Sequence, residues 1–127
     1  MKMLTFSFVW LFIVILIWSL FYYLSIEKTI DYFEDELKSI SLLVSEDDYN
    51  QARVETIKIL NRWNKTEKLW VYFVHQGDVD EISSSIRKID IYIYTENKPL
   101  ALSEIETLKM YLKMVEGNES LSLENLF

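Results

Sequence analysis

The chain has 127 residues, of which 20 are acidic, 13 are basic and none is cysteine, and its formal net charge is −7. The absence of cysteine excludes a disulfide framework, a thiolate zinc site and a lipid-anchored N-terminal cysteine. The acidic balance disfavours nucleic acid and an anionic lipid surface as partners, because both need a basic patch. Two glycines and one proline indicate long uninterrupted helices rather than a turn-rich β domain.

An apolar segment without a charged residue covers residues 3–26. As a helix rising about 1.5 Å per residue it would be ~36 Å long, enough to cross a hydrocarbon core of about 30 Å. It is longer than the apolar stretch of a cleaved signal, and no small-residue cleavage site follows it. Aromatic residues at both of its ends suit the membrane interfaces. We therefore predict a permanent transmembrane anchor over residues 1–26 and a separate helical domain over residues 27–127.

The basic residues around this segment predict its orientation. Lys2 and the α-amino group precede it, whereas Lys28 stands among acidic residues after it. The positive-inside rule counts basic residues and gives acidic ones little weight, so it favours a cytoplasmic N-terminus. We expect a single-pass protein of the cell membrane whose C-terminal domain is extracytoplasmic.

The helix of the anchor is expected to continue beyond the membrane. Apolar residues after it recur at spacings of three and four, which is one stripe along a helix. No glycine or proline interrupts them, so one continuous helix is predicted from about Met3 to Leu43. The members of this first stripe are Ile26, Ile30, Phe33, Leu37, Ile40 and Val44.

A second helix is predicted after residues 45–48, where Ser45 is the candidate N-cap and Asp48 holds the capping-box position. Its apolar stripe predicts a helix that runs to His75, with Gly77 ending it. The members of this second stripe are Tyr49, Ala52, Thr56, Ile59, Trp63, Thr66, Trp70 and Phe73.

Two more helices are predicted in the remainder. Asp78 is the expected N-cap of the third, and Pro99 suits the first position of the fourth. Residues 117–118 are expected to end the fourth helix, and the apolar tail 121–127 to pack back on the bundle. The third stripe is Val79, Ile82, Ile86, Ile89 and Ile93, and the fourth is Ala101, Ile105, Leu108, Leu112 and Val115.

Residues 69–74 and 89–94 are rich in β-forming side chains, so a two-strand hairpin is the rival interpretation. The spacing of three and four runs through both segments without a phase break, and we therefore predict helices there. The expected fold class is all-α: a transmembrane helix that continues into an antiparallel bundle of about four helices joined as up-down hairpins.

No constellation of residues predicts catalysis. His75 is the only histidine and lacks the partners that a catalytic base needs, and nucleotide-binding, hydrolase and zinc-protease motifs do not occur. The acidic clusters are interpreted as solvated faces and helix caps, because none supplies a calcium-binding loop. We expect a protein that is not an enzyme and that has no catalytic residue, no cofactor and no metal site.

Aromatic residues supply the candidate interaction surface. For Trp63 and Trp70, seven residues apart on one helical face, core packing is the favoured interpretation. Apolar side chains beyond those of the stripes indicate helices buried on more than one face or a surface for a partner. The candidate surface residues are Trp63, Trp70, His75, Tyr92 and Tyr94.

The layout of the chain resembles a known family. It combines an N-terminal span, the helix start E-D-D-Y-x-x-A, two tryptophans seven residues apart, a histidine before an acidic and apolar helix start, and the terminus LSLENLF. Together these features resemble the small bacterial membrane-anchored proteins of domain of unknown function 4363, found mainly in spore-forming Gram-positive bacteria. Gly77 departs from the family pattern, which has an acidic residue there. The matching positions are Asp48, Ala52, Trp63, Trp70, His75, Val79, Asp80, Ile82, Ile86, Ile89, Ile93 and residues 121–127.

The resemblance implies a small helical domain outside a Gram-positive membrane, without an assigned activity. We expect a non-enzymatic adaptor or accessory subunit of a membrane protein complex. Its partners would be the lipid bilayer, through residues 3–26, and another membrane protein or a second copy, but not nucleic acid. The alternative is an extracytoplasmic module that binds a small ligand or a divalent cation in a pocket near Trp63, Trp70 and His75.

Overall fold

A computed structural model describes the backbone of residues 1–126 and the side chains of residues 1–118. Its helices are α1 (Lys2–Ser45), α2 (Tyr49–Trp70), α3 (Gln76–Tyr94) and α4 (Lys98–Leu126). No strand occurs within residues 1–126, so the all-α prediction is confirmed and the rival hairpin is absent. Residues 89–94 lie within α3, whereas residues 69–74 cover the end of α2 and the turn that follows it.

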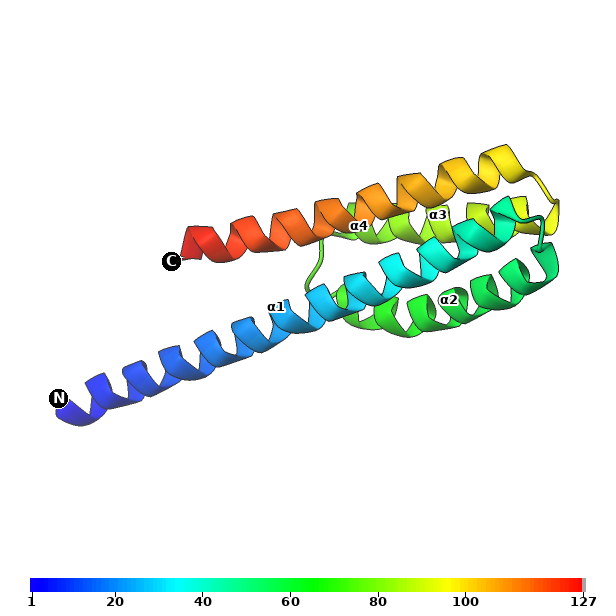
Figure 1. Ribbon diagram of the computed structural model, residues 1–127. Coiled ribbons are helices and arrows are strands. Elements are labelled where there is room, and N and C mark those ends of the chain that lie inside the picture. Colours follow the sequence, from blue (N-terminus) through cyan, green and yellow to red (C-terminus); the bar gives the residue numbers. More distant parts are fainter. Residues whose placement is uncertain (127) are drawn as a thin grey trace.

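The helices alternate in direction and form a ring (Figure 1). α1 and α3 each pack against both α2 and α4. Short connections at alternate ends make this an up-down-up-down bundle, as predicted. The N-terminal half of α1 projects from one end, which we call the proximal end, and the last turns of α4 extend past the α2–α3 turn at the same end (Figure 1). The α1–α2 and α3–α4 turns lie at the opposite, distal end (Figure 1).

α1 runs from Lys2 to Ser45 without a break, which confirms the predicted continuity between the apolar segment and the first core helix. The hydroxyls of Thr5 and Ser7 donate to carbonyls one turn back, at 3.0 and 2.9 Å, so they need no outside partner. Burial begins only at Ile26. The first half of α1 therefore contributes only the partly buried Tyr22 to the edge of the core, and the second half contributes a complete stripe.

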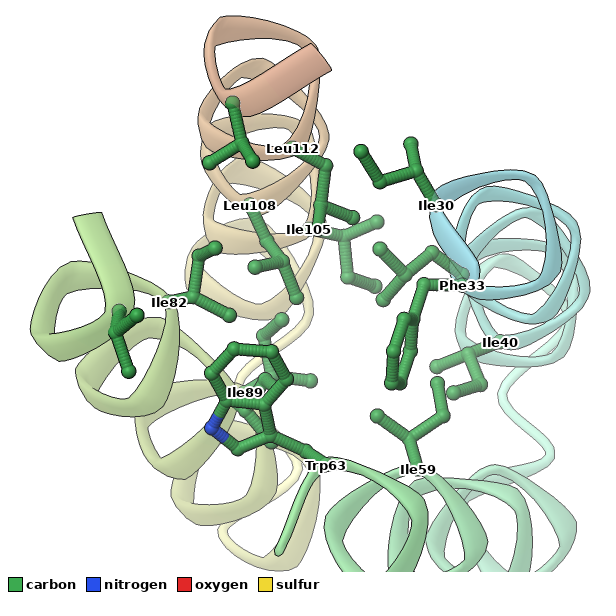
Figure 2. Close-up of a cluster of buried hydrophobic side chains, with 14 of the residues drawn as sticks. Ile30, Phe33, Ile40, Ile59, Trp63, Ile82, Ile89, Ile105, Leu108 and Leu112 are labelled. Carbon is green, nitrogen blue, oxygen red and sulfur yellow. The ribbon is translucent and has the colours of Figure 1, made fainter. Parts of the chain in front are cut away.

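Four apolar stripes, one from each helix, form a single core (Figure 2). Every member of the first, third and fourth predicted stripes is at most 2% exposed. In the second stripe Tyr49 and Thr66 are partly exposed and Phe73 is exposed. Figure 2 shows Phe33 of α1 and Trp63 of α2 pointing into the same space as side chains of α3 and α4. Each buried side chain of this size stabilises the fold by about 1.5–3 kcal/mol.

The start of α2 differs from the prediction. Ser45 is the last residue of α1, and its hydroxyl donates to the Ser41 carbonyl at 2.8 Å. Asp48 is the N-cap instead, because its carboxylate accepts from the Gln51 N–H at 3.2 Å. Asp47, with a φ of 62°, turns the chain between the two helices. An N-cap must directly precede its helix. Because α1 continues to Ser45, that residue does not cap α2, and Asp48 does so instead.

The prediction that α2 reaches His75 is wrong. α2 ends at Trp70, and the turn is stabilised by the N–H groups of Phe73 and Val74, which donate to the Trp70 carbonyl at 3.0 and 2.8 Å. His75 is the N-cap of α3, because its Nδ1 accepts from the Gly77 N–H at 3.2 Å. The residues predicted to end α2 and to cap α3 therefore both lie inside α3; they are Gly77 and Asp78. The residues of the turn, 71–74, are apolar and continue the spacing of three and four in the sequence, although their backbone is not helical.

α4 is longer than predicted. The Asn97 side chain accepts from the Leu100 N–H at 3.3 Å, and Pro99 is the second helical residue rather than the first. The helix continues through Gly117 to Leu126, so residues 117–118 do not end it. A single glycine costs a helix only about 1 kcal/mol, which does not by itself break it. The predicted packing of the tail 121–127 lies outside the described side chains.

A polar chain joins α2 to α3 beside the core. The Trp63 Nε1 donates to the Ser83 hydroxyl at 2.8 Å, and that hydroxyl donates to the Glu67 carboxylate at 3.1 Å. Trp63 is only 2% exposed, so its N–H depends on this partner rather than on water. Ser83 thus supports the placement of the largest core side chain.

Replacing Ser83 by alanine should lower the free energy of unfolding by about 1–2 kcal/mol, because it leaves a buried indole N–H without its acceptor. Ser84→Ala is the matched control, since Ser84 is the exposed next residue of α3; it should be neutral or slightly stabilising. Urea unfolding of the full chain in mild detergent, followed by circular dichroism, measures both. Equal effects of the two substitutions would contradict the proposed support of Trp63.

Candidate functional site

The two tryptophans of the candidate surface lie in the core. Trp63 and Trp70 are each 2% exposed, and their rings meet edge-on with centroids 5.5 Å apart. Trp63 also meets the Phe33 ring edge-on, at 6.1 Å. Aromatic pairs in this geometry stabilise a core beyond the area that they bury. These two side chains therefore belong to the packing of the bundle and not to an exposed surface.

The other three candidates lie at different places on α3. His75 is exposed at its proximal N-cap, and Tyr92 is half-buried near its distal end. Tyr94 is exposed at that end, and the Arg53 guanidinium lies 4.3 Å from the centroid of its ring. Such a cation–π contact at an exposed site stabilises by about 0.5–1 kcal/mol. The structure thus does not bring the five residues together into one site.

A groove of about 570 Å³, with polar and apolar lining, lies between α1 and α2 on the proximal half of the bundle. α1 lines it with hydroxyl groups, and α2 lines it with cationic side chains. Trp70 reaches this groove, but Trp63 and His75 do not line it. The residues that determine its chemistry are Ser25, Thr29, Tyr32, Lys58, Arg62 and Lys65.

The cations in this groove are partly engaged. Lys58 pairs with Glu55 at 3.1 Å, which lowers the pKa of that carboxyl group. The Arg62 guanidinium lies 4.8 Å from the centroid of the Tyr32 ring. With three cationic side chains, the groove is suited to an anionic group and not to the divalent cation of the sequence-based alternative. Its basic character is visible in the sequence, since α2 has five basic and two acidic residues, but the net charge of the whole chain conceals it.

Acidic residues gather where α1 faces α4. Burial raises the pKa of Glu116, and repulsion from the carboxylates of Glu34, Asp31 and Glu27 raises it further. One oxygen of Glu34, Oε1, is buried without a hydrogen-bond partner. Within the part of the chain that the structure describes, no three side chains among His, Cys, Asp and Glu are arranged to hold a metal ion. Repulsion among these carboxylates therefore destabilises the bundle, and their arrangement is not that of a cation site.

The connection between α2 and α3 reaches back along α1. We call residues 71–74 the proximal turn. The ring of Phe73 contacts Tyr22 and Trp18 of α1, with centroids 4.5 and 5.6 Å apart. Both partners belong to the apolar segment 3–26, so the turn lies beside the final turns of that segment. Sequence reasoning missed this contact because it treated these residues as part of α2.

Comparison with known families gives a match that covers most of the chain. The model of the family described as Domain of unknown function (DUF4363) matches residues 20–126. The matched range begins within the apolar segment of α1 and takes in the whole bundle. Neither the curated proteins nor the solved structures that were compared with the chain include a match.

Replacing Glu116 by glutamine should stabilise the bundle slightly at neutral pH. Its pKa is raised in the folded state, so its contribution to stability is present below the ordinary pKa of a glutamate and is lost as the pH rises through the raised value. Because the group is partly solvated, the gain at pH 7 should be at most about 0.5 kcal/mol, and it should vanish near pH 4. Unfolding of both forms at several pH values measures it.

Glu106→Gln is the matched control on the same helix, because Glu106 accepts from Lys109 at 3.1 Å and should gain nothing at neutral pH. A Glu116→Gln variant less stable than the unaltered protein at pH 7 would contradict the repulsion between α1 and α4.

Proposed function

The chain belongs to the family of domain of unknown function 4363, and from its geometry we propose that it is a single-pass membrane-anchored accessory protein. It holds a helical bundle on the extracytoplasmic side of the membrane, against another membrane protein or a second copy of itself. The observation that carries this proposal is the continuity of α1, in which an unburied apolar half and a buried stripe belong to one helix.

The apolar half of α1 supports a membrane anchor. It is long and apolar enough to cross a membrane, and none of its most apolar stretch is buried inside the protein. Its large side chains are exposed on every side of the helix, including Phe6, Trp10 and Phe21. A surface of this kind is costly in water, and a bilayer supplies the partner that it needs.

A cleaved signal sequence is the rival interpretation of an apolar helix near the N-terminus, but three observations favour a retained segment. The helix does not end before the bundle begins. Phe73 packs on Trp18 and Tyr22, a contact that cleavage would remove. The family match starts at residue 20, inside the apolar segment. The segment is thus used by the folded domain, which a discarded signal is not.

Exposed apolar side chains on the outer faces of the bundle support the accessory role. Large apolar side chains are exposed on α2 at Val54 and Ile57, and on α3 at Ile91 and Tyr94. Exposed apolar groups on helix faces are a feature of surfaces that dock a protein partner. The continuous α1 holds these faces at a fixed height above the membrane, since no glycine or proline interrupts it.

Single cysteines test the anchor and its orientation, because the chain has none of its own. A membrane-impermeant maleimide added to intact cells should label Asn50→Cys at the exposed start of α2. It should label Lys2→Cys only after permeabilisation. Both proteins should stay in the membrane fraction after an alkaline carbonate wash. Labelling of position 2 in intact cells would contradict the orientation, and release by carbonate would contradict the anchor.

A photo-crosslinking amino acid tests the accessory role. In place of the exposed Tyr94, it should give a discrete adduct of higher mass in native membranes. In place of Glu106, whose side chain is 69% exposed on α4, it should give little or none. Mass spectrometry of the adduct distinguishes another membrane protein from a second copy. Recovery of isolated monomer alone, from both positions and in mild detergent, would contradict the proposal.

A further inference from the structure

The proximal turn is held rigidly but exposes apolar side chains. Trp70 before it and Val74 at its end are buried, at 2% and 5% exposure. Between them Val71 and Tyr72 point outward with 40% and 80% of their surface exposed, and Leu69 one residue before is 55% exposed. Four backbone N–H groups of the turn donate to carbonyls of α2 at 2.8–3.3 Å. The outward side chains are therefore presented by a fixed backbone and not by a loose loop.

The depth of this turn follows from its contacts with α1. Trp18, which the Phe73 ring touches, lies about 12 Å before Ile26 along the helix axis, at 1.5 Å per residue. Tyr22, the second partner of Phe73, lies one turn closer to Ile26. Both belong to the aromatic end of the apolar segment, where tryptophan and tyrosine occupy a membrane interface. The turn thus reaches past the first buried residue of the bundle and back along the anchor.

We propose that the proximal turn is a second membrane contact, which inserts Leu69, Val71 and Tyr72 into the outer interface of the bilayer beside the end of the α1 span. This inference rests on the proposed anchor. Lipid is the occupant that the position favours, because the neighbouring side chains at the same depth, Trp18 and Phe21, are themselves 60% and 74% exposed. The apolar surface of the turn is continuous with theirs through Phe73.

Charge does not drive this contact. Basic residues near the end of α2, Arg62, Lys65 and Lys68, are offset by acidic residues in the first turns of α3, Asp78, Asp80 and Glu81, and by Glu27 and Asp31 of α1. Binding at a membrane surface that relies on anionic lipids needs a basic cluster, and this end of the bundle has none in excess. The turn should therefore insert into zwitterionic lipid as well as into anionic lipid.

The test uses the full chain in phosphatidylcholine vesicles with one cysteine carrying an environment-sensitive fluorophore. The labelled variants are Tyr72→Cys in the turn, Leu11→Cys in the span and Asn50→Cys at the distal end. A nitroxide on the lipid acyl chain should quench the labels at positions 72 and 11 several-fold more than the label at position 50. Aqueous iodide should show the reverse order. Adding phosphatidylserine to the vesicles should leave the result at position 72 unchanged.

Position 11 separates this inference from the anchor on which it rests. Lipid quenching at position 11 together with iodide quenching at position 72 would overturn the second contact and leave the anchor intact. Absence of lipid quenching at position 11 would overturn the anchor itself. Protection of position 72 from both quenchers would show that protein covers the turn, which also overturns the lipid assignment. Circular dichroism of each variant confirms that the bundle is folded.

Discussion

The structure depends on one helix whose two halves differ in what surrounds them. Over residues 2–25 α1 is almost entirely apolar and only half-buries Tyr22 against the core, and from Ile26 onward it buries a single stripe. The backbone does not change where the environment changes, because a helix satisfies its own N–H and C=O groups in either surrounding. The other three helices need α1, since its stripe closes the ring between α2 and α4.

The core could be predicted residue by residue, but the helix ends could not. Side chains such as Ile30 and Ile105 repeat at helical spacing, and burial of that face is what the spacing encodes. Ser45 and Asp48 are equally good N-caps by residue type, and the choice between them depends on where α1 ends. Gly117 resembles a helix terminator in the sequence, yet α4 passes through it. The position does not require glycine either, because a Cβ there would have no described neighbour from outside its own stretch of helix within 4 Å.

The candidate site was less predictable, because residue type does not report burial or long-range contact. Trp63 and Tyr94 are both aromatic, but one is buried against Phe33 and the other lies exposed under Arg53. The contact between Phe73 and Trp18 joins residues far apart in the chain, and no periodicity encodes such a pair. The turn that makes it was assigned to a helix because all its residues are apolar, and a short apolar run does not distinguish a helix from a turn.

The topology gives the two ends of the bundle different neighbours. Because α2 runs antiparallel to α1, the α2–α3 turn returns to the side of the apolar segment, and the α1–α2 and α3–α4 turns lie about 33 Å away, the length of a 22-residue helix. A bundle held by α1 alone could tilt with that helix relative to the membrane plane. The proposed lipid contact of the proximal turn, on one side of α1, opposes this tilt, because tilting away from it would lift Leu69 and Tyr72 out of the bilayer. It would keep the exposed side chains of α2 and α3, Ile57 and Ile91 among them, at a constant height above the membrane, where a neighbour can contact them.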